Sequence, residues 1–536
     1  MLKSKKLNLT KAETAGFIIL ACQIILIFIF NLVCSPKYID CDSAKVMEHI
    51  IKMWEHKTLI IDNWYYSTIL GYDSVAVFAI PFYGLTKNIF FACSMSNLLS
   101  TLIFVYTIFF IFKGKEKVYP LVASCIILLP WDLGMLEYFN MLFFAGAYYI
   151  VKVTVPLMFA GLILYVERED MKKWWKKKDF MLMFILFLFY LLATTASSGV
   201  FVLAMGFAPV ILVFAIYKLY TWTAPKKEYI VFTILTFISF ILGYVVNMNV
   251  SASDNTLYGG STAFGMKYLD GEDLFLNFSN ALVGIFEVFG ATCTNTGMKP
   301  TTYDVMSYEG IVTFFKIIFV VFLLFNAFYT ISEVLKKKAS LLKGLYVSMF
   351  FWDWLILIFT NTRAGGVGVF EDRYFLIGMI SLIIISTVNL VDFFKSSKIP
   401  GRVSAILGVV VILTMIVISY KDTMFLGEQN PNVWAITEYF KDKGFGRVYI
   451  YNETNEADKL RLVGNPIHYV DVMTNGKTWV YDFYASYQLG PIYEENACII
   501  VNRNILQCKD KDELFGFKVK KVDEVNDYDI FYFDGQ

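Results

Sequence analysis

Long apolar runs separated by short polar stretches dominate the pattern of this chain. A helix of about 20 apolar residues is long enough to cross the hydrocarbon core of a bilayer. The pattern predicts eleven such spans, at residues 14–34, 89–112, 118–131, 142–165, 179–195, 199–220, 228–248, 310–333, 343–361, 374–394 and 402–420. The semi-apolar stretch 69–86 contains Asp73 and Pro81, and we expect it to lie near the membrane surface without crossing.

Lysine and arginine gather in every second connection between these spans. The basic connections are 113–117, 166–178, 223–227, 334–343 and 395–402, and the N-terminal segment is also rich in lysine. Basic connections stay in the cytoplasm. The N-terminus is therefore expected inside, whereas the connections 35–88 and 249–309 and everything after the last span are expected outside.

Residues 428–536 have a different character, because charges return and the apolar runs shorten to strand length. RVYIY, ACIIV and DIFYFD have the composition of strands, and residues 432–441 have the pattern of a short helix. The predicted fold is thus a polytopic α-helical membrane protein with about 11 transmembrane helices at 1–427. A small extracytoplasmic α/β or α+β domain follows at 428–536.

Composition agrees with this class. Of 536 residues, 57% are hydrophobic and 17% are charged, whereas soluble proteins average about 25% charged residues. The net charge of +1 gives no reason to expect a nucleic acid partner. No glycine-rich phosphate loop is present, which argues against a nucleotide-driven pump. His49 and His56 are expected on a solvated helix surface and not in a metal site.

The first outer connection is unusually polar. From Ser43 to His56, apolar side chains recur at helical spacing on one face, and polar side chains occupy the other. Such a helix lies along the membrane surface with its apolar side down. Asp40 and Asp42 sit at its N-terminal end, where a carboxylate can act as general base on an acceptor while a lipid-borne donor arrives from the membrane. Alternatively, Asp42 is only an N-cap and Asp40 a solvated loop residue.

Other polar residues fall on the same predicted side. Asp132 and Glu137 lie in the second outer connection, either as part of an acidic cleft or as ordinary loop polarity. Arg363 and Arg373 flank a glycine-rich connection, and the planar fork of arginine suits a lipid phosphate. Snorkelling, or pairing with a neighbouring carboxylate, is the alternative. Lys152 lies inside a span and is expected to pair with a lipid phosphate or with a buried carboxylate.

Four aromatic residues are candidates for stacking on a sugar, namely Trp64, Tyr65, Tyr66 and Trp131. The favoured alternative is the aromatic belt that membrane proteins place at both interfaces.

Together these features resemble the GT-C superfamily of membrane glycosyltransferases, which includes protein O-mannosyltransferases and lipid A aminoarabinose transferases, and in particular its bacterial, Firmicutes-type members. The resembling segments are IDCDSAKVM with NWYYST in the first outer connection, PWDLGMLEYFN in the second, EDRYF before a late span, and the outer C-terminal domain.

The resemblance implies inverting transfer of a sugar, hexosyl in type, from a polyprenyl-phosphate carrier to a cell-envelope glycan, lipid or protein outside a bacterial cytoplasmic membrane. Asp40 or Asp42 matches the catalytic base, and Asp42 matches better. Asp132 or Glu137 matches the second acidic position, and Arg373, with Arg363 or Lys152, would face the donor phosphate. The lipid-linked sugar is the only cosubstrate implied. The metal-dependent pattern of oligosaccharyltransferases is not matched closely, which argues against an obligatory divalent metal.

Three other functions fit the same composition. A transporter or flippase of lipid-linked saccharides would carry charges deep in several spans and inverted repeats, and the sequence shows neither plainly. A polysaccharide polymerase with another fold would share the substrate class and the location. A non-catalytic scaffold would use the outer domain to bind a wall polymer.

Overall fold

The computed structural model of the 536-residue chain describes residues 10–534, except 62–63, 65–69, 132–137, 145–146, 148, 222, 252–270, 292–303, 361–371, 397–427, 473–479, 483–484, 489–494 and 507–512. Among the described residues, nine helices are long and apolar enough to cross a membrane. They are α1 (Lys11–Cys34), α4 (Ile89–Ile111), α7 (Ile150–Arg168), α8 (Lys178–Ser198), η2 with α9 (Leu203–Phe207 and Ala208–Thr221), α10 (Glu228–Ser251), α12 (Tyr308–Leu335), α13 (Leu341–Phe359) and α14 (Leu376–Ser396). The protein is a multi-pass membrane protein.

These helices coincide with the predicted spans, with two differences. Only the short α5 (Val118–Ile127) occupies the predicted span 118–131. It ends shortly before Pro130, which disfavours helical backbone at the residue before it. The predicted span 142–165 is divided between α6 (Tyr138–Phe143) and α7, because Ala147 has φ of 30° and cannot continue a helix. The predicted span 402–420 lies outside the described residues.

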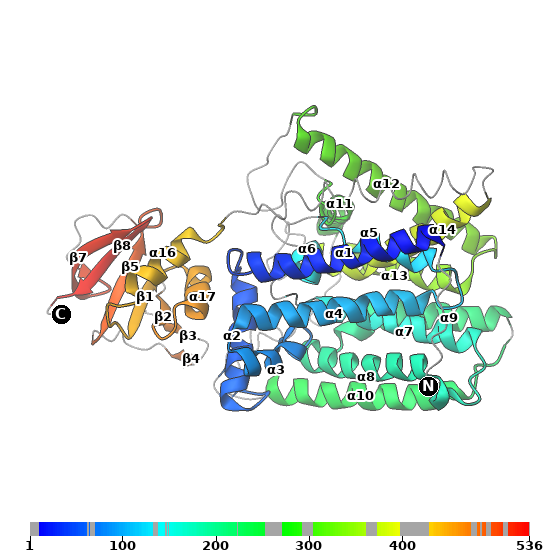
Figure 1. Ribbon diagram of the computed structural model, residues 1–536, viewed down its shortest axis with the longest axis horizontal. Helices are drawn as coiled ribbons and strands as arrows, with labels where there is room; N and C mark the ends of the chain where they lie inside the picture. The colour runs from blue at the N-terminus through cyan, green and yellow to red at the C-terminus, as the bar shows by residue number, and fades with distance from the viewer. Residues whose placement is uncertain are drawn as a thin grey trace.

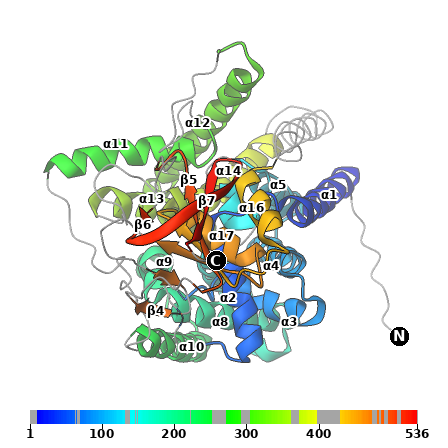
Figure 2. The ribbon, with the colours of Figure 1, turned by 90° about the vertical axis from the view of Figure 1, so that its left-hand side faces the viewer.

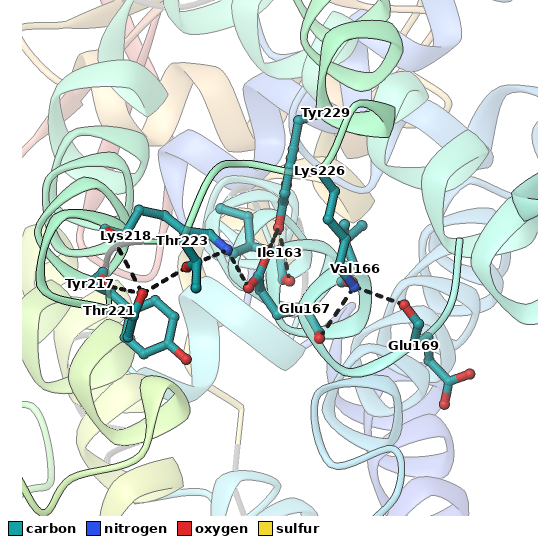
Figure 3. Close-up of polar contacts among 10 residues, drawn as sticks. All are labelled: Ile163, Val166, Glu167, Glu169, Tyr217, Lys218, Thr221, Thr223, Lys226 and Tyr229. Atoms are coloured by element: carbon teal, nitrogen blue, oxygen red, sulfur yellow. Dashed lines mark hydrogen bonds and ion pairs between the residues drawn. The ribbon is translucent and has the colours of Figure 1, made fainter. Parts of the chain in front are cut away.

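The long helices run side by side, and the C-terminal sheet lies beyond one end of their bundle (Figure 1). We call this the sheet end and the opposite one the basic end. The predicted basic connections meet at the basic end, where Lys395 lies 2.8 Å from Glu116 and Lys113 lies 2.5 Å from Asp179. A third cluster there joins α7, α9 and α10, with Glu167 accepting from Lys218 Nζ at 2.6 Å and from Tyr229 OH at 3.0 Å (Figure 3).

Small and polar residues let α8 and α10 approach closely. A Cβ atom on Gly243 would lie 1.9 Å from Thr195 Oγ1 and 2.7 Å from the Leu192 carbonyl oxygen. Nearby, the Asn247 side chain donates to the Ala196 carbonyl oxygen at 3.0 Å. Small residues and interhelical hydrogen bonds are what hold helices together in lipid, where burial of apolar surface gives little advantage.

Three shorter helices accompany the bundle at the sheet end. α2 (Cys41–His56) runs across the ends of the long helices, between them and the C-terminal domain (Figure 1). α3 (Ala76–Thr86) has 11 residues and is too short to cross, in agreement with the prediction for 69–86. α11 (Gly271–Glu287) also lies crosswise (Figure 2), and Asn277 attaches it to the end of α13 by donating to the carbonyl oxygens of Leu357 and Thr360, both at 3.1 Å.

The C-terminal domain is a mixed sheet with strand order β4-β3-β2-β1-β5-β8-β7-β6. Its elements in chain order are α16 (Pro431–Phe440), β1 (Arg447–Tyr451), α17 (Thr454–Val463), β2 (His468–Val472), β3 (Val480–Asp482), β4 (Ala485–Gln488), β5 (Ala497–Asn502), β6 (Glu513–Leu514), β7 (Phe517–Val525) and β8 (Tyr528–Phe533). β1 is parallel to β2 and β5, with Tyr449 beside Val470 and Ile499, and the other pairs are antiparallel. The three predicted strands and the predicted helix are confirmed.

We predict that Gly243→Ala destabilises the bundle by about 1–3 kcal/mol, because the added methyl group overpacks the contact with Thr195. Thermal unfolding in detergent measures the loss. Leu242→Ala is the matched control, since Leu242 directly precedes Gly243 and is 56% exposed. Equal melting temperatures for Gly243→Ala and wild type would contradict this account of the α8–α10 contact.

Candidate functional site

The start of α2 fixes the two candidate carboxylates in different positions. Asp40 is the N-cap, and its Oδ1 accepts from the Ser43 amide at 2.7 Å and from the Ser43 hydroxyl at 2.9 Å. The extended backbone of Asp40 places the cap before Cys41, so Asp42 already lies in the first helical turn. The alternative that Asp42 is the N-cap is therefore wrong.

The surroundings of the two carboxylates also differ. Asp40 Oδ2 accepts from Asn140 of α6 at 3.0 Å. Burial raises the pKa of Asp40, although the hydrogen bonds from Ser43 and Asn140 act in the opposite direction. The side chain of Asp42 is 51% exposed and lies 3.9 Å from Lys45 Nζ. Asp40 thus holds the turn together, whereas Asp42 remains accessible to an acceptor.

A buried ion pair lies nearby at the sheet end. Lys152, in the first turn of α7, has its Nζ 3.5 Å from Asp73 Oδ2, and both side chains are at most 4% exposed. Ser198 Oγ, at the end of α8, donates to the same Asp73 oxygen at 2.7 Å. Of the two partners expected for Lys152, the structure shows the buried carboxylate.

Arg373 belongs to the same neighbourhood. It lies in η4 (Asp372–Phe375), a turn that packs against α6 and leads into α14. Its guanidinium lies 5.7 Å from the ring centre of Tyr374. The Tyr374 ring lies 6.5 Å from the ring of Tyr149, and Lys152 Nζ lies over that ring at 4.6 Å. Arg373 and Lys152, from distant parts of the chain, therefore come together. Asp132, Glu137 and Arg363 lie outside the described residues.

The two tryptophans among the candidates for sugar stacking, Trp131 and Trp64, are packed inside the protein. Trp131 is 1% exposed and stacks on Phe319 with ring centres 4.4 Å apart, while Phe289 meets it edge-on. Trp64 is 4% exposed and stacks on His49 at 5.2 Å. In this structure neither ring presents an open face to a sugar or to the membrane interface. Tyr65 and Tyr66 lie outside the described residues.

The expectation that His49 is a solvated surface residue is wrong. His49 is 4% exposed, because Trp64 and Tyr72 cover it. Burial lowers its pKa to about 3, which keeps the imidazole neutral at physiological pH. The polar face of α2 is thus covered by protein over part of its length.

Sequence reasoning missed two partners of the candidates. Asn140 stands in a run of apolar and aromatic residues, and only its polar side chain distinguishes it. Asp73 stands in the semi-apolar stretch 69–86, and an acidic residue in such a stretch is the signal that could have marked it. Within the described residues, no three His, Cys, Asp or Glu side chains come together as a metal site requires.

A cavity of about 440 Å³ lies away from these residues, between α7, α8, α9 and α10. Phenylalanines dominate its walls, and Val166 and Tyr229 place it next to the polar cluster at the basic end (Figure 3). Its lining contains neither a carboxylate nor a cation. Because the lining offers no charged group, this cavity is not a candidate reaction site despite its size. The polar groups at the sheet end are the better candidate.

The helical bundle, the crosswise helix and the C-terminal domain together share their fold with two solved structures. ArnT from Cupriavidus metallidurans bound to undecaprenyl phosphate superposes with a TM-score of 0.57 at 11% sequence identity, over 96% of this chain and 97% of that chain. The apo state of the same ArnT gives a TM-score of 0.55 at 11% identity and the same coverage. No family model and no curated protein matches the sequence.

We predict that Asp40→Ala loosens α2 by about 1 kcal/mol, because the N-cap is lost, whereas Asp40→Asn keeps it, since asparagine caps equally well. Amide hydrogen exchange of α2 should then be roughly fivefold faster in the alanine variant only. Glu55→Ala, at the exposed far end of the helix, is the control. Equal exchange in Asp40→Ala and wild type would refute the cap.

The buried pair gives a second prediction. Asp73→Ala leaves Lys152 charged and uncompensated, which costs about 3–5 kcal/mol, and the double variant Asp73→Ala/Lys152→Met should recover most of that loss. Thermal unfolding in detergent compares the two. Asp179→Ala serves as the control, because it removes an exposed pair with Lys113, worth about 0–1 kcal/mol. No difference between Asp73→Ala and the control would contradict a buried charge at Lys152.

Proposed function

We propose that the protein transfers a sugar from a polyprenyl-phosphate carrier to an acceptor at the sheet end of the bundle. The observation that carries the proposal is the placement of the accessible Asp42 at the same end as Lys152 and Arg373. The fold supports it, because ArnT, which shares this fold, was crystallised with undecaprenyl phosphate.

In this proposal Asp42 is the general base. An acceptor hydroxyl gives its proton to the Asp42 carboxylate while its oxygen attacks the anomeric carbon of the donor sugar. The bond between the anomeric carbon and the carrier phosphate breaks, and polyprenyl phosphate leaves with the electron pair. Attack opposite the leaving group inverts the configuration. Asp40, partly buried and capping the helix, orients Asp42 and takes no proton.

Arg373 and Lys152 would receive the phosphate of the donor. The fork of Arg373 fits two phosphate oxygens, and a cation placed where negative charge develops lowers the barrier to departure of the carrier. Asp73 would keep Lys152 in place while the site is empty. Arg363 is proposed to assist, and Asp132 or Glu137 to supply the second acidic position.

The proposed orientation in the membrane follows from the distribution of lysine and arginine. The basic end would face the cytoplasm of a bacterial plasma membrane, because lysine-rich connections stay inside. The sheet end and the C-terminal domain would then lie outside, where a cell-envelope glycan, lipid or protein accepts the sugar. Residues 1–427 would carry the chemistry, with a hexose as the transferred sugar. The phosphate ester of the carrier is already activated, so the reaction needs no nucleotide.

We predict that Asp42→Asn lowers the rate of sugar transfer by about 10²–10⁴-fold, because the amide cannot accept the proton. Asp40→Asn should lower it far less, since asparagine still caps α2. Transfer of radiolabelled sugar from a panel of polyprenyl-phosphate sugars, in membranes with matched protein levels, measures both.

Lys113→Gln, at the exposed basic end, is the matched control and should transfer at the wild-type rate. Collapse in Asp40→Asn with Asp42→Asn active would reverse the assignment of the base. Full activity in both variants would remove α2 from the chemistry. Polymerisation of a lipid-linked saccharide, or its movement across the bilayer without transfer, would overturn the proposed reaction.

A further inference from the structure

We propose that the C-terminal domain positions the carboxylate-bearing turn of α2, with Asn430 and Asp458 as positioning residues for the transfer. The inference rests on the proposed function, because it assigns these residues to the reaction of Asp42. It depends on two separate attachments of the domain, one to the residues that precede Asp42 and one to the residues that follow it.

The first attachment holds the backbone just before the helix. The Asn430 side chain donates to the carbonyl oxygen of Ile39 at 3.0 Å and to that of Lys37 at 3.2 Å. The Gln429 amide also donates to the Lys37 carbonyl oxygen, at 3.1 Å. Asn430 is 6% exposed and accepts from Lys459 of α17 at 3.0 Å. Because Ile39 immediately precedes the cap residue, Asn430 sets where α2 begins relative to the domain.

The second attachment is ionic and lies one turn into the helix. Lys45 Nζ is 3.4 Å from Asp458 Oδ2 and 3.9 Å from Asp42 Oδ1. The side chain of Asp458 is fully buried, whereas that of Asp42 is 51% exposed. A charge pair is stronger where water is excluded, so Asp458 holds Lys45 more firmly than Asp42 does. Through Lys45, a residue of the C-terminal domain controls the positive charge that faces the proposed base.

Arg461 completes the ionic contact from the same helix. It pairs with Asp458, and its Nε lies 3.9 Å from Glu48 Oε2 on the next turn of α2. Its side chain is 2% exposed, and it also donates to the Tyr469 carbonyl oxygen at 3.2 Å. The guanidinium therefore ties Asp458 to the sheet, so that Asp458 cannot follow Lys45 if α2 moves.

The charges around Lys45 are consistent with this arrangement. Burial alone would lower the pKa of Lys45, but Asp458 and Asp42 outweigh it, so the pKa is raised and the lysine stays cationic. Burial raises the pKa of Asp458, against the charges of Arg461 and Lys45. The other titratable groups of this turn are Asp40, Cys41, whose pKa burial raises to about 12, and Glu48.

The two attachments enclose Asp40 and Asp42 between fixed points at Ile39 and Lys45. One point alone would leave α2 able to pivot, whereas two points restrain both its position and its rotation. Misplacing a reacting group by about 1 Å can cost 100-fold in rate. Loss of either attachment should therefore lower turnover and leave recognition of the donor at Arg373 and Lys152 intact.

The experiment measures kcat and KM for the donor with the purified full-length protein. Asn430→Ala should lower kcat by about 10- to 100-fold, with KM for the polyprenyl-phosphate sugar within about twofold. Asp458→Asn should give the same split, a kcat about 10- to 100-fold lower with KM nearly unchanged, because Lys45 loses its fixed partner in the domain. Lys45→Met should lower kcat in the same way, and the two losses should not add, since both changes remove one attachment. A merely structural contact would lower the amount of folded protein and would not lower kcat selectively at unchanged KM.

Arg503→Gln is the matched control. It removes ion pairs with Glu524 and Asp529 and a hydrogen bond to the Asn526 carbonyl oxygen, at the β7–β8 connection of the same domain. It should leave kcat and KM unchanged. Wild-type kcat in both Asn430→Ala and Asp458→Asn would overturn the positioning role, and so would additive losses of kcat when Asp458→Asn and Lys45→Met are combined.

Amide hydrogen exchange separates this inference from the proposed function. The amides of residues 38–48 should exchange at least about tenfold faster in Asn430→Ala than in wild type. Their exchange rates in Arg503→Gln should equal those of the wild type. Both results are expected whether or not any sugar is transferred. Failure of the wild type to transfer from any donor would overturn the proposed function while the exchange result still stands. Unchanged exchange in Asn430→Ala would overturn the attachment itself.

Discussion

Taking a charged side chain out of water costs several kilocalories per mole, and the distribution of charge in this chain follows from that cost. Lysines and glutamates meet at the basic end, as Lys395 and Glu116 do. The described exceptions inside the bundle have partners. Lys152 faces Asp73 at 3.5 Å, and Asp353 of α13 accepts from the Gly378 amide at 2.8 Å.

The same cost explains why polar chemistry gathers where the helices end. α2 lies there with Met47, Ile50 and Met53 at most 2% exposed against the bundle. Its polar face meets α17, where Asp458 and Arg461 balance Lys45 and Glu48. The apolar face of this amphipathic helix is thus covered by the bundle, and part of its polar face is covered by the C-terminal domain. The exposed Asp42 side chain remains open at the seam between bundle and domain, a place where a lipid-borne donor and a water-borne acceptor can meet.

How far the site was predictable depends on how local each feature is. Asp40 and Asp42 could be recognised from the local sequence, because two acidic residues directly precede a helical pattern. The partners of these residues could not be recognised in this way. Asn140 is 100 residues from Asp40, and Asn430 is 391 residues from Ile39. Asp458 looks like any solvated acid in a helix until α2 packs against it.

By itself the sequence determined the class of protein and most of its elements. Span length, charge bias and strand composition are local properties of the sequence. They directly predict the membrane-spanning helices, the orientation of these helices and the strands of the C-terminal domain. Residue type also marked the carboxylates of the first connection and Arg373. Only the tertiary structure decided that Asp40 and not Asp42 is the cap, that His49 and Trp131 are buried, and that Lys152 pairs with Asp73. Those outcomes depend on which distant surfaces pack together, and a one-dimensional pattern of polarity does not contain that information.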